Sequence, residues 1–213
     1  MWPPPPTHRP SAALPAACLL FISVERLART IALLLVCFVV LSVGVVSIPA
    51  VSRYEFEQSV CSTQILQAFL LFVTGLCFLV WTYRLHRNLR ALGAGCLRFT
   101  PMWAVGYFFI PVFSFYRPYQ IFREIWQASD PGIAPRTGQR WKAISPPAFL
   151  GFWWVALIVS AVMNGIAAGY PNDHGAGSAA AVFSLASALL TLLVVRSFTK
   201  RQERTVRLLT LLH

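Results

Sequence analysis

Charged residues are scarce in this 213-residue sequence: they make up 12% of the chain, whereas hydrophobic residues make up 57%. A soluble domain usually carries about twice that share of charge, so the composition excludes an ordinary soluble protein. The high apolar content also excludes a disordered chain. The glycines follow no period, which excludes a collagen, and the five cysteines show no paired spacing, which excludes a disulfide framework.

Acidic residues are even rarer than basic ones, with 7 Asp and Glu against 18 Lys and Arg and a formal net charge of +11. A positive excess of this size is also typical of nucleic-acid-binding proteins. Here, however, the basic residues lie between long apolar runs. We therefore expect a membrane protein and no nucleic-acid partner.

Four charge-free intervals are long enough to form a transmembrane helix, which needs about 20 residues. They predict spans at residues 31–52, 62–83, 149–170 and 178–196. A fifth charge-free segment, residues 99–116, contains Pro101 and Pro111. Because proline lacks a backbone donor and kinks a helix, this segment is predicted to be a re-entrant or interfacial hairpin. The sequence does not decide between these two.

The distribution of basic residues favours the four-span topology, because cytoplasmic loops of membrane proteins are enriched in Lys and Arg. With four spans and both termini inside, 17 of the 18 basic residues are cytoplasmic and only Arg53 lies outside. If residues 99–116 crossed the membrane, 7 would lie inside and 11 outside. The sequence therefore predicts a multi-pass protein of the bacterial inner membrane with a cytoplasmic N-terminus and C-terminus.

The ends of the chain carry weaker signals. Residues 1–15 are rich in proline and are predicted to be a disordered tail, and residues 17–29 are predicted to be a lead-in helix at the inner surface. We expect a single membrane domain over residues 16–207, followed by a short C-terminal tail, residues 208–213.

The segment between the second and third spans has two amphipathic stretches. Leu85, Leu89 and Leu92 share one helical face, so the second span should continue past the membrane until Gly93 and Gly95 end it. A second helix is predicted over residues 118–129, with Pro118 in its first turn. Its apolar face is Ile121, Phe122 and Ile125, flanked by Trp126, and its polar face is Gln120, Arg123, Glu124 and Gln127. A short helix of this kind suits the headgroup plane.

Several ordered motifs in this region resemble a known family. They are the run FLVWTYRLHRNLRALG, the segment from Pro101 to Pro111, the run YRPYQIFREIWQASDP and the run GFWWVALIVSAVMN. From about Ile65 to Asn164 the chain resembles the bacterial membrane-protein family called domain of unknown function 4328. The resemblance marks Trp81, Arg84, Arg87, Asn88, Trp103, Gly106, Pro111, Arg117, Pro118, Tyr119 and Trp126. It implies a multi-pass bacterial membrane protein and implies no activity.

Arginine and aromatic residues are the candidate binding residues on the cytoplasmic side. They are Arg84, Arg87, Asn88, Trp103, Arg117, Tyr119, Arg123 and Trp126, and they are candidates for binding lipid headgroups or a protein partner. We predict that Arg84, Arg87, Asn88 and Arg117 act as one site beneath the hairpin. The alternative is that these charges only set the orientation of the protein in the membrane.

Small residues recur at four-residue spacing in the last two spans, a pattern that lets helices approach closely in lipid. They are Ala161, Gly165 and Gly169 in one span and Ala180, Ser184 and Ala188 in the other. The pattern favours close packing of the two spans in one hairpin, and homodimerisation is the alternative. Asn164 is the most polar residue deep in an apolar span, and we expect it to bond to a neighbouring helix.

Motifs of enzymes, metal sites and cofactor sites are missing. The sequence has no glycine-rich phosphate loop, no H-E-x-x-H, no G-x-S-x-G and no C-x-x-C, and its four histidines lie far apart. We therefore expect no catalytic residue, no metal and no cofactor. The preferred hypothesis is an all-α integral membrane protein that acts as a scaffold or binds lipid or a partner. The alternative is a small transporter or lipid-handling protein that uses the proline-broken segment.

Overall fold

The computed structural model describes residues 21–47, 53–131, 140–170 and 174–211. This part of the chain is helical and contains no β-strand, which confirms the predicted all-helical class. The helices, in chain order, are α2 (Glu25–Ser47), α3 (Arg53–Ala91), α4 (Pro101–Gly106), α5 (Pro111–Ser114), α6 (Arg117–Ala128), the 3-10 helix η1 (Arg140–Ala143), α7 (Ala148–Gly169) and α8 (His174–Leu211).

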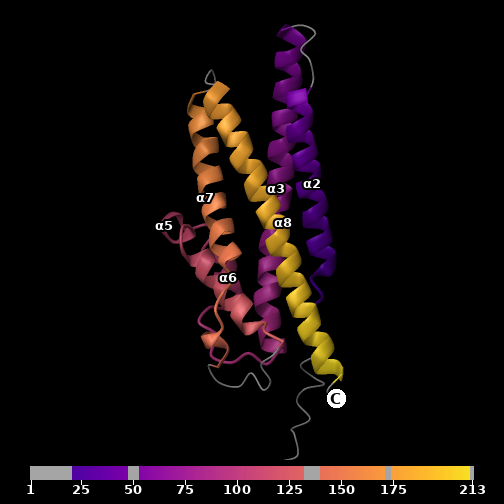
Figure 1. Ribbon diagram of the computed structural model, residues 1–213, viewed down its shortest axis with the longest axis vertical. Helices are drawn as coiled ribbons and strands as arrows, with labels where there is room; N and C mark the ends of the chain where they lie inside the picture. Colours follow the sequence, from indigo (N-terminus) through magenta and orange to yellow (C-terminus); the bar gives the residue numbers. More distant parts are fainter. Residues whose placement is uncertain (1–20, 48–52, 132–139, 171–173, 212–213) are drawn as a thin grey trace, which may run out of the picture.

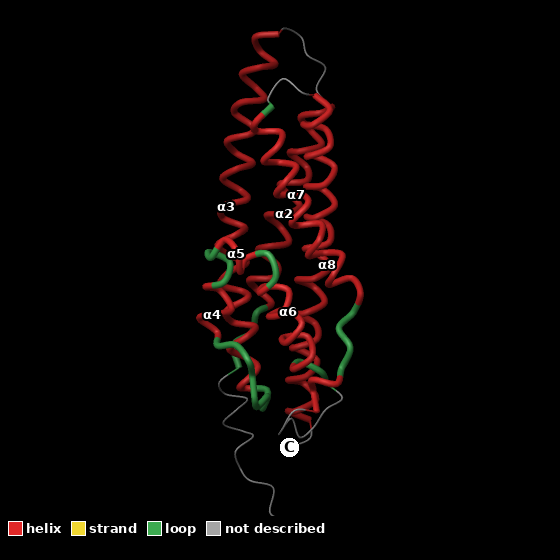
Figure 2. The backbone as a smooth tube through the Cα atoms, turned by 90° about the vertical axis from the view of Figure 1, so that its left-hand side faces the viewer, coloured by secondary structure: helices red, strands yellow, loops and turns green. Residues whose placement is uncertain are grey.

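The four long helices form two antiparallel pairs, α2 with α3 and α7 with α8 (Figure 1). Helix α8 runs obliquely and packs on α2 in its lower part. We call the end that holds α6, η1 and the end of α8 the near end, and the end where α2 and α7 finish the far end. The two pairs diverge toward the far end and meet at the near end (Figures 1 and 2).

Three helical segments are long and apolar enough to cross a membrane: Thr63–Ala91, Ala148–Gly169 and Gly175–Leu211. They correspond to the second, third and fourth predicted spans. Helix α2 contains most of the first predicted span, but it begins with Glu25, Arg26 and Arg29 and is not among the three.

The predicted helix boundaries around the second span match the structure. Helix α3 continues as far as Ala91, and Gly93 follows with φ of 81°, a conformation that glycine adopts without steric cost. The N–H of Ala94 donates to the carbonyl of Leu89 at 2.9 Å, as in a helix C-cap. Helix α6 begins at Arg117, one residue before the expected start at Pro118.

The start of the described chain differs from what the sequence predicted. Residues 21–24 are not helical, and the helix that begins at Glu25 continues without a break into the first predicted span. The separate lead-in helix over residues 17–29 is therefore not present in its described part. At the other end of the chain, α8 continues as far as Leu211 and so includes residues 208–211. The predicted disordered tail, residues 1–15, lies outside the described residues.

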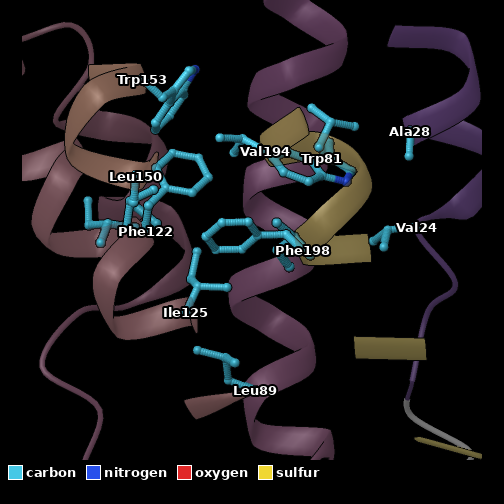
Figure 3. Close-up of a cluster of buried hydrophobic side chains, with 14 of the residues drawn as sticks. Val24, Ala28, Trp81, Leu89, Phe122, Ile125, Leu150, Trp153, Val194 and Phe198 are labelled. Atoms are coloured by element: carbon cyan, nitrogen blue, oxygen red, sulfur yellow. The ribbon is translucent and has the colours of Figure 1, made fainter. Parts of the chain in front are cut away.

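The core is a group of aromatic side chains at the near end (Figure 3). Phe122 of α6 lies at its centre, with ring centroids 5.0 Å from Trp153 and 5.5 Å from Phe198. Trp81 stacks on Phe122 from α3 at 6.1 Å. Because each ring comes from a different helix, this cluster joins α3, α6, α7 and α8. Aromatic pairs in such geometry add about 0.5–1.5 kcal/mol each beyond the area they bury.

Candidate functional site

A buried polar network lies at the near end, below the aromatic core. The side-chain amide of Asn88 donates to the carbonyl of Ile22 at 2.8 Å and to Gln202 Oε1 at 3.3 Å. Gln202 Nε2 in turn donates to the carbonyl of Leu85 at 2.9 Å and to Ser129 Oγ at 3.2 Å. Both amide side chains are almost fully buried. The network therefore ties the start of the described chain to α3, α8 and the end of α6.

A buried titratable pair lies beside this network. His86 Nε2 is 3.6 Å from Glu124 Oε2, and both side chains are almost completely removed from solvent. The second carboxylate oxygen of Glu124 accepts a hydrogen bond from the backbone N–H of Arg98 at 2.5 Å. Neither ring nitrogen of His86 has a hydrogen-bond partner in the described structure. Glu124 thus links α6 both to α3 and to the start of the hairpin segment.

Gln127, a second polar residue of α6, also faces protein. Gln127 Nε2 donates to the carbonyl of Ile144 at 2.5 Å, and Trp141 Nε1 donates to the carbonyl of Gly95 at 3.1 Å. The polar face predicted for α6 is therefore wrong at Glu124 and Gln127, which are 5% exposed each. The segment around η1 folds over this face and covers it, and a helical wheel does not contain that information.

An open pocket of about 360 Å³ lies between α6, η1 and the turn before α4, and we call it the α6–η1 pocket. Three cationic side chains, Arg98, Arg123 and Lys142, line it and are exposed. Its remaining lining residues are Phe99, Gln120, Glu124, Gln127 and Trp141. Since the carboxylate of Glu124 is buried and already hydrogen-bonded, the open mouth of the pocket is positively charged.

Residues 99–116 form a hairpin that leaves the near end and returns to it. The N–H of Arg98, just before the hairpin, donates to Glu124, just after it, and Figure 2 shows α4 and α5 turning back well short of the far end. Trp154 Nε1 donates to the carbonyl of Phe115 at 2.7 Å, which fixes the returning arm to α7. Met102, Phe109 and Val112 are at least 70% exposed. The hairpin therefore offers an apolar surface to its surroundings.

Arg117 lies in a cage of aromatic rings at the base of the hairpin. Its guanidinium carbon is between 5.3 and 5.8 Å from the ring centroids of Phe99, Tyr107, Phe113 and Tyr116. It also donates to Gln120 Oε1 at 3.4 Å. Such contacts contribute about 0.5–2 kcal/mol each, depending on desolvation. This arrangement gives Arg117 a structural role in closing the hairpin.

The predicted single site of Arg84, Arg87, Asn88 and Arg117 is not assembled by the described contacts. Asn88 faces Ile22 and Gln202, whereas Arg117 faces the rings of the hairpin. Arg84 is half-buried and Arg87 exposed, and neither makes a hydrogen bond or ion pair with a described residue. Asn88 and Arg117 therefore have different partners.

The other candidate binding residues are divided between surface and interior. Arg123 is exposed and lines the α6–η1 pocket. Trp103 is 52% exposed on the hairpin and packs on Tyr107 at 5.2 Å. Tyr119 packs against the core. Trp126 is half-buried, and the guanidinium carbon of Arg201 lies 4.2 Å from the centroid of its ring.

The small residues of the last two spans are not all at the interface between α7 and α8. Ala180 and Ala188 are buried, as close packing requires, but Ala161, Gly165 and Gly169 are exposed. No heavy atom outside the immediate helix backbone lies within 4 Å of where a Cβ of Gly165 or Gly169 would be. The α7 half of the predicted pattern is therefore wrong as a description of the hairpin interface. Polar contacts join the two helices instead: Asn164 Nδ2 donates to Ser184 Oγ at 2.8 Å.

The sequence matches the family model of a domain of unknown function, DUF4328, over residues 48–200. The chain belongs to this family. The DUF4328 match extends in both directions beyond the stretch that carries the resemblance in the sequence. It contains the α6–η1 pocket and the hairpin, whereas α2 lies before it. No curated protein and no solved structure matches the chain.

Several residues at the near end were missed by sequence reasoning. Arg98 and Lys142 join Arg123 only because α6 and η1 pack together. The uncharged residues Phe198, Gln202 and Thr205 form a stripe in the otherwise basic end of α8, and this pattern would have indicated a buried face. Among the residues that the structure describes, no three His, Cys, Asp or Glu side chains lie close enough to hold a metal ion.

Proposed function

We propose that this protein is a non-enzymatic, four-span scaffold of the bacterial inner membrane that binds anionic phospholipid headgroups in its α6–η1 pocket. The first span is α2, which pairs with α3 and carries no charge from Thr30 to Ser47. Both termini and the segment from α4 to η1 are cytoplasmic. A helix of this length and composition crosses the hydrocarbon core when its charged first turns remain at the interface.

The observation that carries the proposal is the position of the pocket at the foot of the apolar hairpin. Residues 98 and 99 line the pocket, and the exposed apolar side chains of Met102, Phe109 and Val112 follow directly. When such a hairpin enters the inner leaflet, the pocket lies at the level of the headgroups. Arg98, Arg123 and Lys142 then face phosphates, and each basic side chain near an anionic surface contributes about 1 kcal/mol.

The orientation is tested by labelling of single cysteines in intact cells. In a background without the five native cysteines, an impermeant thiol reagent should label S178C near the start of α8. It should label R90C only after the membrane is permeabilised. Labelling of R90C in intact cells would reject the cytoplasmic placement of the near end.

Lipid binding at the pocket is tested with R98Q/R123Q and a matched control, R90Q/R204Q, which removes two exposed basic residues that do not line the pocket. Both proteins are purified from membranes, and their bound phosphatidylglycerol is measured by mass spectrometry. The pocket variant should retain several-fold less of this lipid than the control. Equal retention by the two variants would overturn the proposed headgroup site.

The transporter alternative required a polar cavity that reaches the proline-broken segment. Within the described chain, the α6–η1 pocket includes Phe99 at the start of that segment and no residue from 101–116. This pocket therefore supports the headgroup-binding scaffold and gives no support to the transporter alternative.

A further inference from the structure

A second hollow lies on another side of the near end, between α2 and α8. This groove has a volume of about 580 Å³. From α2 it is lined by apolar side chains, among them Ala32, Leu33 and Val36, and by Arg29. From α8 it is lined by Arg196 and Lys200, which are exposed. None of these residues belongs to the α6–η1 pocket or to the candidates that the sequence indicated.

The register of the two helices places the charges at one end of the groove. Ser23 Oγ donates to Glu203 Oε1 at 3.0 Å, so these two residues mark the same level. The helices run in opposite directions (Figure 1). With a rise of 1.5 Å per residue, Arg29 lies about 6 Å along α2 from its start at Glu25, and Arg196 lies about 10 Å along α8 from Glu203, both toward the far end. Both arginines line the groove, Arg29 from α2 and Arg196 from α8.

The apolar residues lie beyond this pair of arginines. By the same rise, Leu33 and Val36 are about 6 and 10 Å further toward the far end than Arg29. Leu33 is 65% exposed and Val36 is 44% exposed, and no other described helix covers them. On both helices the sequence beyond the arginines is uncharged, from residue 30 onward in α2 and from 195 back to 175 in α8. The groove thus changes from cationic to apolar along its length.

The net charge at the groove remains positive after its acids are counted. Glu25 forms an ion pair with Arg29 at 3.2 Å, and both side chains are more than half exposed. Glu203 accepts a hydrogen bond from Ser23. Arg196, Lys200 and Arg207 also line the groove, and none of the three has an ion-pair partner among the described residues. Cations next to an apolar wall are complementary to an anionic amphiphile, which carries a phosphate next to its acyl chains.

We infer that the α2–α8 groove binds one anionic phospholipid, with its phosphate between Arg29 and Arg196 and an acyl chain along Ala32, Leu33 and Val36. The inference rests on the proposed function for the four-span orientation, which places this end in the inner leaflet. It goes beyond that function because the groove is a second site: none of its lining residues lines the α6–η1 pocket. Helix α2, which supplies that wall, lies before the family match.

The test compares two variants that each remove one arginine from α2 and one from α8. R29Q/R196Q changes the groove, and R26Q/R204Q is the matched control, since neither Arg26 nor Arg204 lines it. Each full-length protein is reconstituted in nanodiscs of equal phosphatidylglycerol and phosphatidylcholine, extracted in mild detergent and analysed by native mass spectrometry. The groove variant should show about a tenfold lower preference for phosphatidylglycerol than the control. Equal preference would overturn the inference.

A second variant tests the apolar part without changing any charge. A32F places a ring in the groove above the arginines and should lower the retention of phosphatidylglycerol, while its thermal unfolding in detergent stays close to that of wild type. If A32F retains as much lipid as wild type, the acyl chain does not lie in the groove. Loss of lipid in R98Q/R123Q but not in R29Q/R196Q would reject the groove and leave the proposed function intact. Loss of lipid in R29Q/R196Q but not in R98Q/R123Q would reject the α6–η1 pocket as the headgroup site and support lipid binding in the groove.

Discussion

At the near end of the bundle the large side chains of α3, α6, α7 and α8 bury one another, whereas toward the far end the long helices expose theirs. Trp81, Phe122, Trp153 and Phe198 are less than 2% exposed. In contrast, Ile65 and Phe69 of α3 and Val182 of α8 are more than 60% exposed. The near end is therefore held together by the protein itself, and the far end presents apolar surface for lipid to cover.

The polar contacts follow the same division. Near-end hydrogen bonds join residues far apart in sequence, such as Asn88 and Gln202, which are separated by 114 positions. Far-end bonds join partners within one helix pair, such as Gln67 with Ser42 and Asn164 with Ser184. Helices in lipid gain no hydrophobic driving force from meeting. The comparison therefore indicates that the near end fixes the arrangement of the two pairs, and the far end keeps each pair together.

The largest expected effect is at the centre of the near end. W81A removes a side chain that packs on Phe78, Phe122 and Phe198 and donates to Thr199 at 3.3 Å. It should lower the free energy of unfolding in detergent by about 3–5 kcal/mol. F69A, at a position exposed toward the far end, should change it by less than about 0.5 kcal/mol. Similar losses for both variants would remove the distinction between the two ends.

A smaller effect is expected from the buried polar network. Q202A leaves the amide of Asn88, the carbonyl of Leu85 and the hydroxyl of Ser129 without this partner. The expected cost is about 2 kcal/mol, because unsatisfied buried groups keep their desolvation penalty. R204A, at an exposed position on the same helix, is the control. Titration with a denaturing detergent measures both, and equal midpoints would show that the network does not stabilise the near end.

The edge of the near end is tested at the aromatic cage. R117K keeps the positive charge but loses the planar stacking on four rings and the bond to Gln120, and it should cost about 1 kcal/mol. R84K should be neutral, because Arg84 makes no described polar contact. Thermal unfolding in detergent distinguishes the two variants. A neutral R117K would mean that the cage holds the cation by charge alone.

The smallest effect is expected at the far end. N164A removes the bond of 2.8 Å between α7 and the hydroxyl of Ser184. Hydrogen bonds between helices in membranes contribute about 0.6 kcal/mol on average. A double-mutant cycle with S184A isolates this coupling in the unfolding free energy. A coupling as large as the effect of Q202A would contradict the division of roles between the two ends.

The sequence by itself determined the features that depend on neighbouring residues. Apolar length predicts four spans, and three of them correspond to described helices that are long and apolar enough to cross a membrane. Glycine predicts the end of α3 at Gly93, and proline predicts the start of α6. The periodic apolar residues Ile121, Phe122 and Ile125 are fully buried, as the helical wheel indicates. These properties follow from local chemistry: transfer of side chains out of water, backbone steric limits and the helical repeat.

Only the tertiary structure decided which polar residues are buried and with whom. Glu124 and Gln127 lie on the face predicted to be polar and solvated, yet η1 and the turn at Arg98 cover that face. The glycines of α7 form a regular pattern but lie outside its interface with α8. Arg29 and Arg196 belong to segments that no motif connects, and antiparallel packing places them across one groove. Each of these outcomes depends on contacts between distant segments. The hydrophobic period and the charge count describe one segment at a time and so cannot predict such contacts.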